Sequence, residues 1–335
     1  MRPQIQRIPS LFRICLLALS MASAAAQAND NITADPAKTT ATELYEQGRL
    51  EEAQTAFKNL REQHDGADPS YYLGLISEQQ GDFETAAEYM EKAAELAPLN
   101  SVYQQKLGEY YGTQAGSAGV FKKLGLAKKS RVSFARAVEL DGSNLDARSG
   151  LITYYLEAPG IAGGSEEKAL EQATEIFRQD PARGHFERAR VYQKQENFDA
   201  AESEYRAAIE INRENPDPWL ALGIFLTSQE RYDEALALYR ERLSAMPDDM
   251  PIIYQLGRTA SISGQSLDEG RAAFERYISE YQPAPDDPGL DWAHYRLGLI
   301  YQALGNPEDA RREYEAALTI NADHPEAGKA LKKLN

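Results

Sequence analysis

The fold is decided by a six-residue segment that reads Gly81-Asp82-Phe83-Glu84-Thr85-Ala86. The segment combines a turn residue, a polar residue, an aromatic residue or Leu, two mostly acidic or polar residues, and a closing Ala. Similar segments recur at residues 48–53, 196–201, 230–235 and 305–310. The closing alanines lie 33 residues apart from Ala53 to Ala86, and 34 apart from Ala201 to Ala235. A period of about 34 residues around such a turn is typical of a solenoid of helix-turn-helix repeats.

Further positions recur in register with this turn. The helix before the turn carries a bulky residue, then Leu-Gly or a similar small pair, then Tyr. The helix after it carries Ala, an aromatic residue four positions on, and a further apolar residue. One clear copy contains Trp219, Leu222-Gly223, Leu226, Ala235, Tyr239 and Pro247. Small residues allow two helices to approach closely, and the aromatic residues fill the space between successive pairs.

On these residues the chain resembles a tetratricopeptide repeat protein over roughly residues 39–335. The resemblance implies an all-α, right-handed superhelical solenoid of about eight helix-turn-helix repeats. It also implies a scaffold or adaptor that binds a protein or peptide partner in the concave groove. Insertions at 112–124 and 158–165 interrupt the pattern. Residues 325–335 are expected to form a capping helix, because a terminal repeat needs a polar outer cover.

The N-terminal segment has the features of a signal peptide. Three arginines and an apolar run from Ile14 precede Ala26-Gln27-Ala28, which places small residues at the spacing of a cleavage site. We expect residues 1–28 to be cleaved and residues 29–38 to form a flexible lead. The mature protein is then expected to be periplasmic or secreted in a bacterium, without stable membrane insertion. The only Cys, Cys15, lies within the expected signal, so the mature chain should contain no disulfide.

The chain is acidic. It carries 36 Lys and Arg against 52 Asp and Glu, and loss of the three arginines of the expected signal changes the net charge from −16 to −19. This charge argues against nucleic acid and anionic membranes as general partners. The four histidines have no metal-ligand spacing, and the sequence contains no nucleophile elbow or phosphate loop. We therefore predict a protein that is not an enzyme and binds no cofactor or metal.

Groove-facing positions of the first helix of each repeat are predicted to bind the partner. They carry aromatic residues and arginines, which commonly anchor protein interfaces. The predicted groove residues are Tyr71, Glu78, Gln105, Glu109, Arg183, Phe186, Arg190, Tyr254, Arg258, Trp292 and Tyr295. Three of the arginines are expected to hold an acidic partner by charge-assisted hydrogen bonds: Arg183, Arg190 and Arg258.

A basic cluster that begins within the first insertion offers an alternative surface, formed by Lys122, Lys123, Lys128 and Lys129. It is either a docking edge for an acidic partner or lipid head group, or it only offsets the negative charge of the acidic repeats around it. Two other functions stay open at this point. The chain is alternatively a soluble binder of a small acidic ligand or glycan, or a regulatory subunit of an envelope enzyme complex.

Overall fold

Helices make up all of the regular structure in this computed structural model, which describes residues 36–63, 66–280 and 288–334. The predicted signal peptide and residues 29–35 of the predicted flexible lead lie outside the described residues, whereas residues 36–38 of that lead are helical. In chain order the helices are α1 (Pro36–Glu46), α2 (Leu50–Gln63), α3 (Ala67–Gln79), α4 (Phe83–Leu96), α5 (Ser101–Ser117), α6 (Val120–Leu140), α7 (Leu145–Glu157), η2 (Gly160–Ala162), α8 (Glu166–Gln179), α9 (Pro181–Lys194), α10 (Phe198–Ile211), α11 (Pro216–Ser228), α12 (Tyr232–Ala245), α13 (Met250–Ser263), α14 (Leu267–Glu280), α15 (Leu290–Ala303), α16 (Pro307–Ile320) and α17 (Ala327–Lys333).

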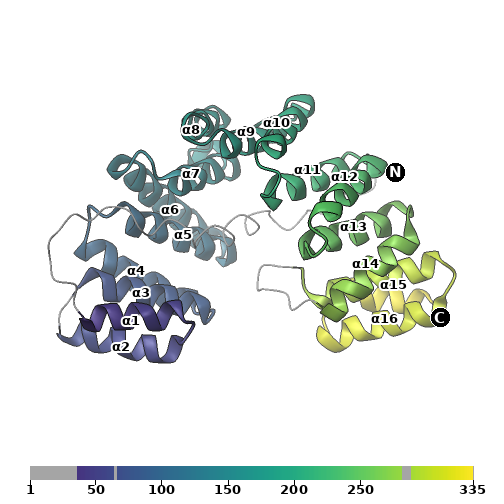
Figure 1. Cartoon of the computed structure of the whole chain (residues 1–335), viewed down its shortest axis with the longest axis horizontal. Coiled ribbons are helices and arrows are strands. Elements are labelled where there is room, and N and C mark those ends of the chain that lie inside the picture. The colour runs from purple at the N-terminus through teal and green to yellow at the C-terminus, as the bar shows by residue number, and fades with distance from the viewer. Residues whose placement is uncertain (1–35, 64–65, 281–287, 335) are drawn as a thin grey trace. The chain divides into compact units, whose positions relative to one another are not determined.

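Tight turns join the helices into consecutive helix-turn-helix pairs (Figure 1). The first residue of each repeated segment has a positive φ and so reverses the chain in the left-handed region: Gly48, Gly81, Glu196, Glu230 and Gly305. The side chain of Asp82 then accepts a hydrogen bond of 3.0 Å from the Thr85 backbone N–H and caps α4. The predicted all-α solenoid of helix-turn-helix repeats is confirmed.

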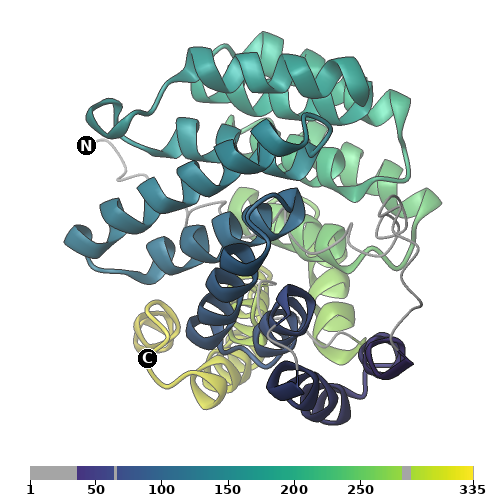
Figure 2. The same ribbon diagram turned by 90° about the vertical axis from the view of Figure 1, so that its left-hand side faces the viewer.

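The chain divides into two compact units within α10, between Ala201 and Glu202. In the N-terminal unit each helix from α1 to α9 contacts the next, as the stacked helices of Figure 2 show. In the C-terminal unit the same holds from α11 to α17. First helices also contact the first helices of neighbouring repeats, as in the pairs α5 and α7, α7 and α9, and α13 and α15. Each unit therefore presents a row of first helices.

A glycine of the first helix lies against a large side chain of the second helix in several repeats. The pairs are Gly74 with Met90, Gly108 with Phe134, Gly223 with Tyr239, Gly257 with Phe274, and Gly298 with Tyr314. A Cβ atom added at Gly223 would lie 2.1 Å from the Tyr239 ring, so no other residue fits there without rearrangement. These contacts explain why the Leu-Gly and aromatic positions recur together in the sequence.

The two insertions have different structures. Residues 112–124 lengthen helices: α5 extends to Ser117 as a helix of 17 residues, and α6 begins at Val120 and has 21 residues. Residues 158–165 form a compact turn that contains η2, with Gly163 at φ 92°. The Tyr154 hydroxyl of α7 donates a hydrogen bond to the Ala162 carbonyl in this turn.

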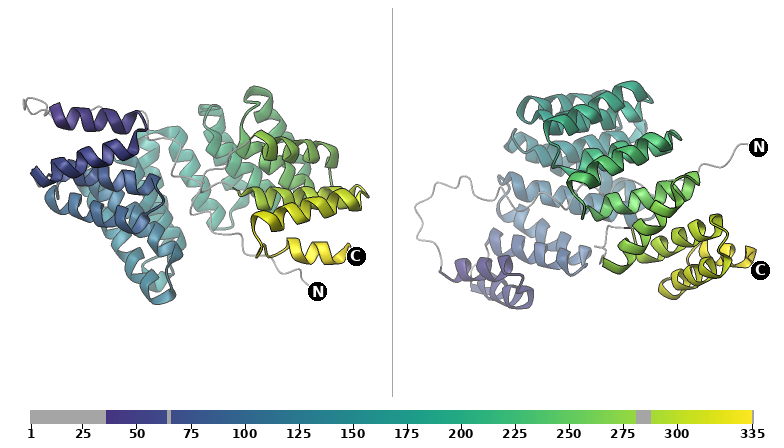
Figure 3. Two further views of the ribbon diagram at one scale, coloured as in Figure 1. Left: turned by 90° about the horizontal axis from the view of Figure 1, so that it is seen from below. Right: turned by 45° about the vertical axis from the view of Figure 1, so that its right-hand side comes forward.

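The C-terminal helix α17 packs on α16, and both lie at the yellow end of the chain in Figure 3. Lys332 and Lys333 lie in the last turn of α17, where positive charge is favourable for a helix. None of the helices in the described parts of the chain combines the length and apolar character that crossing a membrane requires.

Candidate functional site

The small residue of each first helix determines which side chains reach the surface. Gly257 lies against the ring of Phe274, and Tyr254, three positions earlier, shares that face of α13. Tyr254 is consequently only 4% exposed, with its ring 5.5 Å from that of Phe274. Gln105 and Phe186 occupy the same position in α5 and α9 and are also buried. The prediction that these three side chains face an open groove is wrong, because they lie on the packing face.

The residue directly after the small residue is half-buried in each unit. This position holds Leu75, Glu109, Arg190, Arg258 and Leu299. The remaining predicted groove residues are half-buried as well: Tyr71, Glu78, Arg183, Trp292 and Tyr295. The row of first helices thus keeps a partly accessible polar and aromatic surface, within which the contacts of each charged side chain decide whether it is available to a partner.

The predicted residues of α3 and α5 form one internal polar network. The Tyr110 hydroxyl donates a hydrogen bond of 2.8 Å to Glu78. Glu109 accepts a hydrogen bond of 2.8 Å from the Gln105 amide and one of 2.7 Å from Lys106 Nζ. Burial alone would lower the pKa of Lys106, but the carboxylates of Glu109 and Glu78 outweigh it and hold the pKa above its ordinary value. The charges of this network are therefore satisfied within the protein.

The arginines of α9 are held by α7. Arg183 lies 2.7 Å from the Asp146 carboxylate and donates a hydrogen bond of 2.8 Å to Ser149. Arg190 pairs with Glu187 at 2.7 Å and donates to the Thr153 hydroxyl at 3.0 Å. Both guanidinium groups therefore stabilise the packing of two first helices. A partner would have to compete with these contacts.

Two arginines of the C-terminal unit have a different environment. Neither Arg258 of α13 nor Arg296 of α15 forms an ion pair within the described residues. Burial lowers the pKa of Arg258, and the positive charge of Arg296 lowers it further. The Nε atom of Arg296 is buried and finds no hydrogen-bond acceptor in the described structure. An anion bound near the two guanidinium groups would offset their repulsion.

Aromatic side chains gather beside Arg296. The Arg296 guanidinium lies 5.8 Å from the centre of the Trp292 ring, a distance typical of a cation–π contact. Trp292 in turn packs edge-on against Tyr295, with 5.9 Å between ring centres. The His324 ring packs at a tilt against both rings, with its centre 4.5 Å from that of Trp292 and 5.1 Å from that of Tyr295. Arginines beside half-buried aromatic rings are the usual composition of a binding hot spot.

Sequence reasoning identified Arg258, Trp292 and Tyr295 but missed Arg296 and His324. Arg296 lies two residues before Gly298, a position that the repeat pattern does not mark as groove-facing. Its signal was the four-residue spacing from Trp292, which places both side chains on one helix face. His324 lies in the loop after α16, and only the packing of that loop brings its ring to α15.

The environment of His324 predicts that the stability of the C-terminal helix α17 depends on pH. Its Nδ1 accepts hydrogen bonds of 3.2 Å from the backbone N–H groups of Glu326 and Ala327, and burial lowers its pKa despite the nearby Asp291 carboxylate. The unfolded chain, with a His pKa of about 6.5, therefore binds this proton more readily than the folded chain. Stability from this group is complete above pH 6.5 and falls as the pH decreases below it.

Hydrogen exchange in α17, corrected for intrinsic rates, should accordingly be faster at pH 5.5 than at pH 7.5. The His324→Gln variant cannot gain this charge, so the difference between the two pH values should shrink. An equal pH effect in both proteins would show that His324 does not control the cap.

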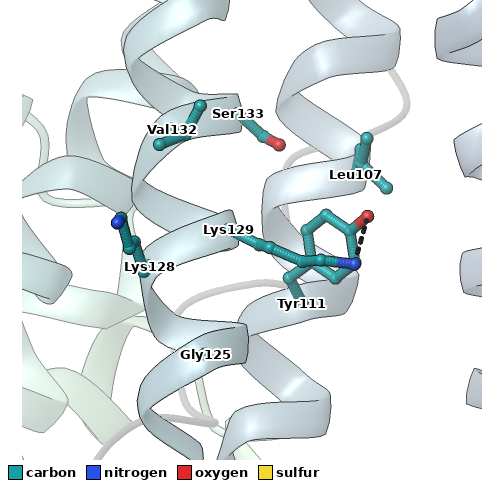
Figure 4. Close-up of a pocket in the computed structure, with 7 residues that line it drawn as sticks. All are labelled: Leu107, Tyr111, Gly125, Lys128, Lys129, Val132 and Ser133. Atoms are coloured by element: carbon teal, nitrogen blue, oxygen red, sulfur yellow. Dashed lines mark hydrogen bonds between the residues drawn. The ribbon is translucent and has the colours of Figure 1, made fainter.

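The basic cluster lies on α6. Lys122, Lys123 and Lys128 are exposed and form no ion pair with any described residue. Lys129 differs, because its Nζ lies 3.7 Å from Glu91 and donates a hydrogen bond of 3.4 Å to the Tyr111 hydroxyl (Figure 4). Three of the four predicted lysines are therefore available to a partner, and the fourth is held within the N-terminal unit.

Comparison with known proteins identifies the repeats. Tetratricopeptide repeat family models match residues 39–101, 186–249 and 292–324. A tetratricopeptide repeat protein of Parabacteroides merdae has a similar crystal structure, with a TM-score of 0.51, 19% identity, and coverage of 80% of this chain and 98% of that one. These matches show tetratricopeptide repeats and their helical solenoid fold.

Curated relatives match parts of longer proteins. DnaJ homolog subfamily C member 3 of Gallus gallus is 26% identical over 68% of this chain and 48% of its own length. Cellulose synthase operon protein C of Xanthomonas axonopodis is 30% identical over 47% of this chain and 10% of its own length. The chain thus spans about half or less of the length of these relatives.

Proposed function

We propose that this chain of tetratricopeptide repeats is an exported scaffold that holds a protein partner in a bacterial envelope process. The repeats themselves support protein binding, since stacked repeats create extended concave surfaces that proteins of this architecture use for binding. The observation that carries the proposal is the pair Arg258 and Arg296, neither of which forms an ion pair with a described residue, and of which Arg296 lies beside the Trp292 ring. An acidic segment of the partner is the ligand that this chemistry favours.

Capture from an envelope extract tests this function. The full mature chain, immobilised and treated with a short cross-linker, should retain one predominant protein. The double variant Arg258→Gln/Arg296→Gln should lose that protein while remaining folded. If the variant retains the same protein, the arginine pair does not bind the partner.

A small acidic ligand is the second candidate, and the same arginine pair favours it. Two guanidinium groups bind a free carboxylate or phosphate by the same hydrogen bonds that would hold an acidic peptide segment. Native mass spectrometry of the chain purified from its own cells separates the two functions. A bound species of small mass that is absent from the double variant would show that the chain binds a small ligand, and this function would then replace the scaffold function.

Export rests on the N-terminal sequence, where an apolar run precedes Ala26-Gln27-Ala28. A signal peptidase requires small residues at this spacing. Mass spectrometry of the protein from an envelope fraction should therefore show an N-terminus near Asn29. An intact Met1 in that fraction would contradict export by cleavage.

A further inference from the structure

The end of α5 and most of α6 form a positively charged island in an acidic chain. From Tyr110 to Val138 the sequence contains six Lys and Arg and no Asp or Glu, although the whole chain contains 52 acidic residues. The lengthening of α5 and α6 is what creates this segment, because residues 112–124 lie inside it. The island is therefore specific to this repeat, and the other repeats do not share it.

Apolar side chains accompany these charges on the surface of α6. Leu124 is 50% exposed and Val132 is 51% exposed, with the exposed Lys128 midway between them at four-residue spacing. The three side chains form one stripe along the helix. The opposite face of α6 packs on α5, where Phe134 covers Gly108 and the Ser130 hydroxyl donates a hydrogen bond of 2.7 Å to the Gly108 carbonyl.

A pocket of about 310 Å³ adjoins this stripe between α5 and α6. Figure 4 shows Leu107 and Tyr111 on one wall, and Val132 and Lys128 on the other. Gly125 leaves the space open, because a Cβ atom added there would meet no other atom within 4 Å. The volume lies at the lower end of the range of about 300–1,000 Å³ for ligand sites, which suits one or two inserted side chains.

We propose that this surface, called here the α6 edge and formed by Lys122, Lys123, Leu124, Gly125, Lys128 and Val132, binds an acidic segment of a partner protein. A bulky apolar side chain of that segment enters the pocket, and Asp or Glu residues beside it meet the exposed lysines. Charge complementarity selects this occupant, since Lys122, Lys123 and Lys128 form no ion pair with any described residue. An anionic membrane fits less well, because the chain carries a formal net charge of −16 that repels an anionic surface.

The α6 edge belongs to the N-terminal unit and the arginine pair to the C-terminal unit. Different variants therefore test the two proposed sites, and one proposal can be wrong while the other holds.

The probe is a fluorescent synthetic peptide with one Phe flanked by glutamates, measured by anisotropy with the full mature chain. Binding should be saturable and should weaken as salt increases. The variant Lys122→Gln/Lys123→Gln/Lys128→Gln should weaken it about tenfold, since several exposed charge contacts are lost together.

A variant that fills the pocket tests the contribution of the pocket to peptide binding separately from that of the lysines. Gly125→Leu should weaken peptide binding by about tenfold or more, because the inserted side chain loses its apolar site. Gly116→Leu is the matched control, since Gly116 is an exposed glycine of α5 with equally open surroundings. The control should bind the peptide like the wild-type chain, and circular dichroism should show equal helix content in both variants.

A component of peptide binding that is lost in the lysine and Gly125 variants but retained in Gly116→Leu and in Arg258→Gln/Arg296→Gln supports the α6 edge. Three results would overturn it. One is that the Gly125 variant binds the peptide as tightly as the wild-type chain. Another is that the chain does not bind the peptide but binds vesicles of anionic phospholipid through these lysines. The third is that the only effect of the lysine variant is a loss of self-association of the chain in sedimentation.

Discussion

Replacing Tyr239 by Ala should lower the free energy of unfolding of the C-terminal unit by about 3–5 kcal/mol, the usual cost of removing a large buried aromatic ring. Tyr239 is 0% exposed, and its ring lies directly against the backbone of Gly223. Without the ring, α11 and α12 would be separated by a cavity. Urea denaturation followed by circular dichroism measures the change.

Two companion variants identify the cavity as the cause. Tyr239→Phe keeps the ring and removes a buried hydroxyl that has no hydrogen-bond partner in the described structure, so stability should stay nearly the same or rise. Gly223→Ala places a Cβ atom 2.1 Å from the ring and should destabilise the wild-type chain. In the Tyr239→Ala background the same methyl group enters the cavity, so its cost should largely disappear. Additive effects of the two substitutions would contradict direct packing between these residues.

The damage should also be local. Each repeat contacts mainly its neighbours, so coupling weakens along a solenoid. Hydrogen exchange in the Tyr239→Ala variant should increase most in α11 to α13 and least in α16 and α17. Equal loosening of all these helices would indicate that the C-terminal unit unfolds as a single cooperative block.

The double variant Arg258→Gln/Arg296→Gln should lose partner binding without losing stability. Truncating one hot-spot arginine commonly costs about 2 kcal/mol or more, so the pair should weaken binding by about a hundredfold or more. Neither side chain forms an ion pair in the described structure, and the Arg296 Nε makes no hydrogen bond. Their removal therefore leaves no buried carboxylate unpaired, and the melting temperature should stay the same or rise.

Arg242 provides the matched control for this variant. Its side chain is 4% exposed and pairs with the equally buried Asp249 at 2.7 Å. Arg242→Gln leaves that carboxylate unpaired and should cost about 3–5 kcal/mol. A large loss of stability in Arg258→Gln/Arg296→Gln, similar to that of Arg242→Gln, would show that the arginine pair has a structural role instead.

The helical repeats could be predicted from the sequence because they depend on local rules. Gly81 and its counterparts supply the positive φ of the turn, and Gly223 and Tyr239 must be small and large together for two helices to pack. Such constraints repeat in every pair and so leave a periodic pattern. The same rules explain why the additional residues 112–124 were recognised as a departure from the period.

The site was less predictable because it depends on contacts between repeats. Tyr254 and Phe186 look like surface anchors in the sequence, yet each lies three residues before the small packing residue and is buried. Arg183 and Arg258 look alike in the sequence, but only Arg183 finds a carboxylate on the neighbouring helix. The partner of a side chain one repeat away has no fixed spacing along the chain. That Arg258 and Arg296 form no ion pair with a described residue therefore became visible only in three dimensions.

The fluorescence of Trp292 tests the central claim most directly, because its ring adjoins Arg296 while the other tryptophan, Trp219, is 2% exposed. Titration of the full mature chain with a glutamate-rich peptide should give a saturable change that weakens with salt and is absent for the matching glutamine peptide. In Arg258→Gln/Arg296→Gln the midpoint should move to about a hundredfold higher peptide concentration or beyond. A change of the same size and midpoint in the wild-type chain and the double variant would contradict an acidic partner site at this arginine pair.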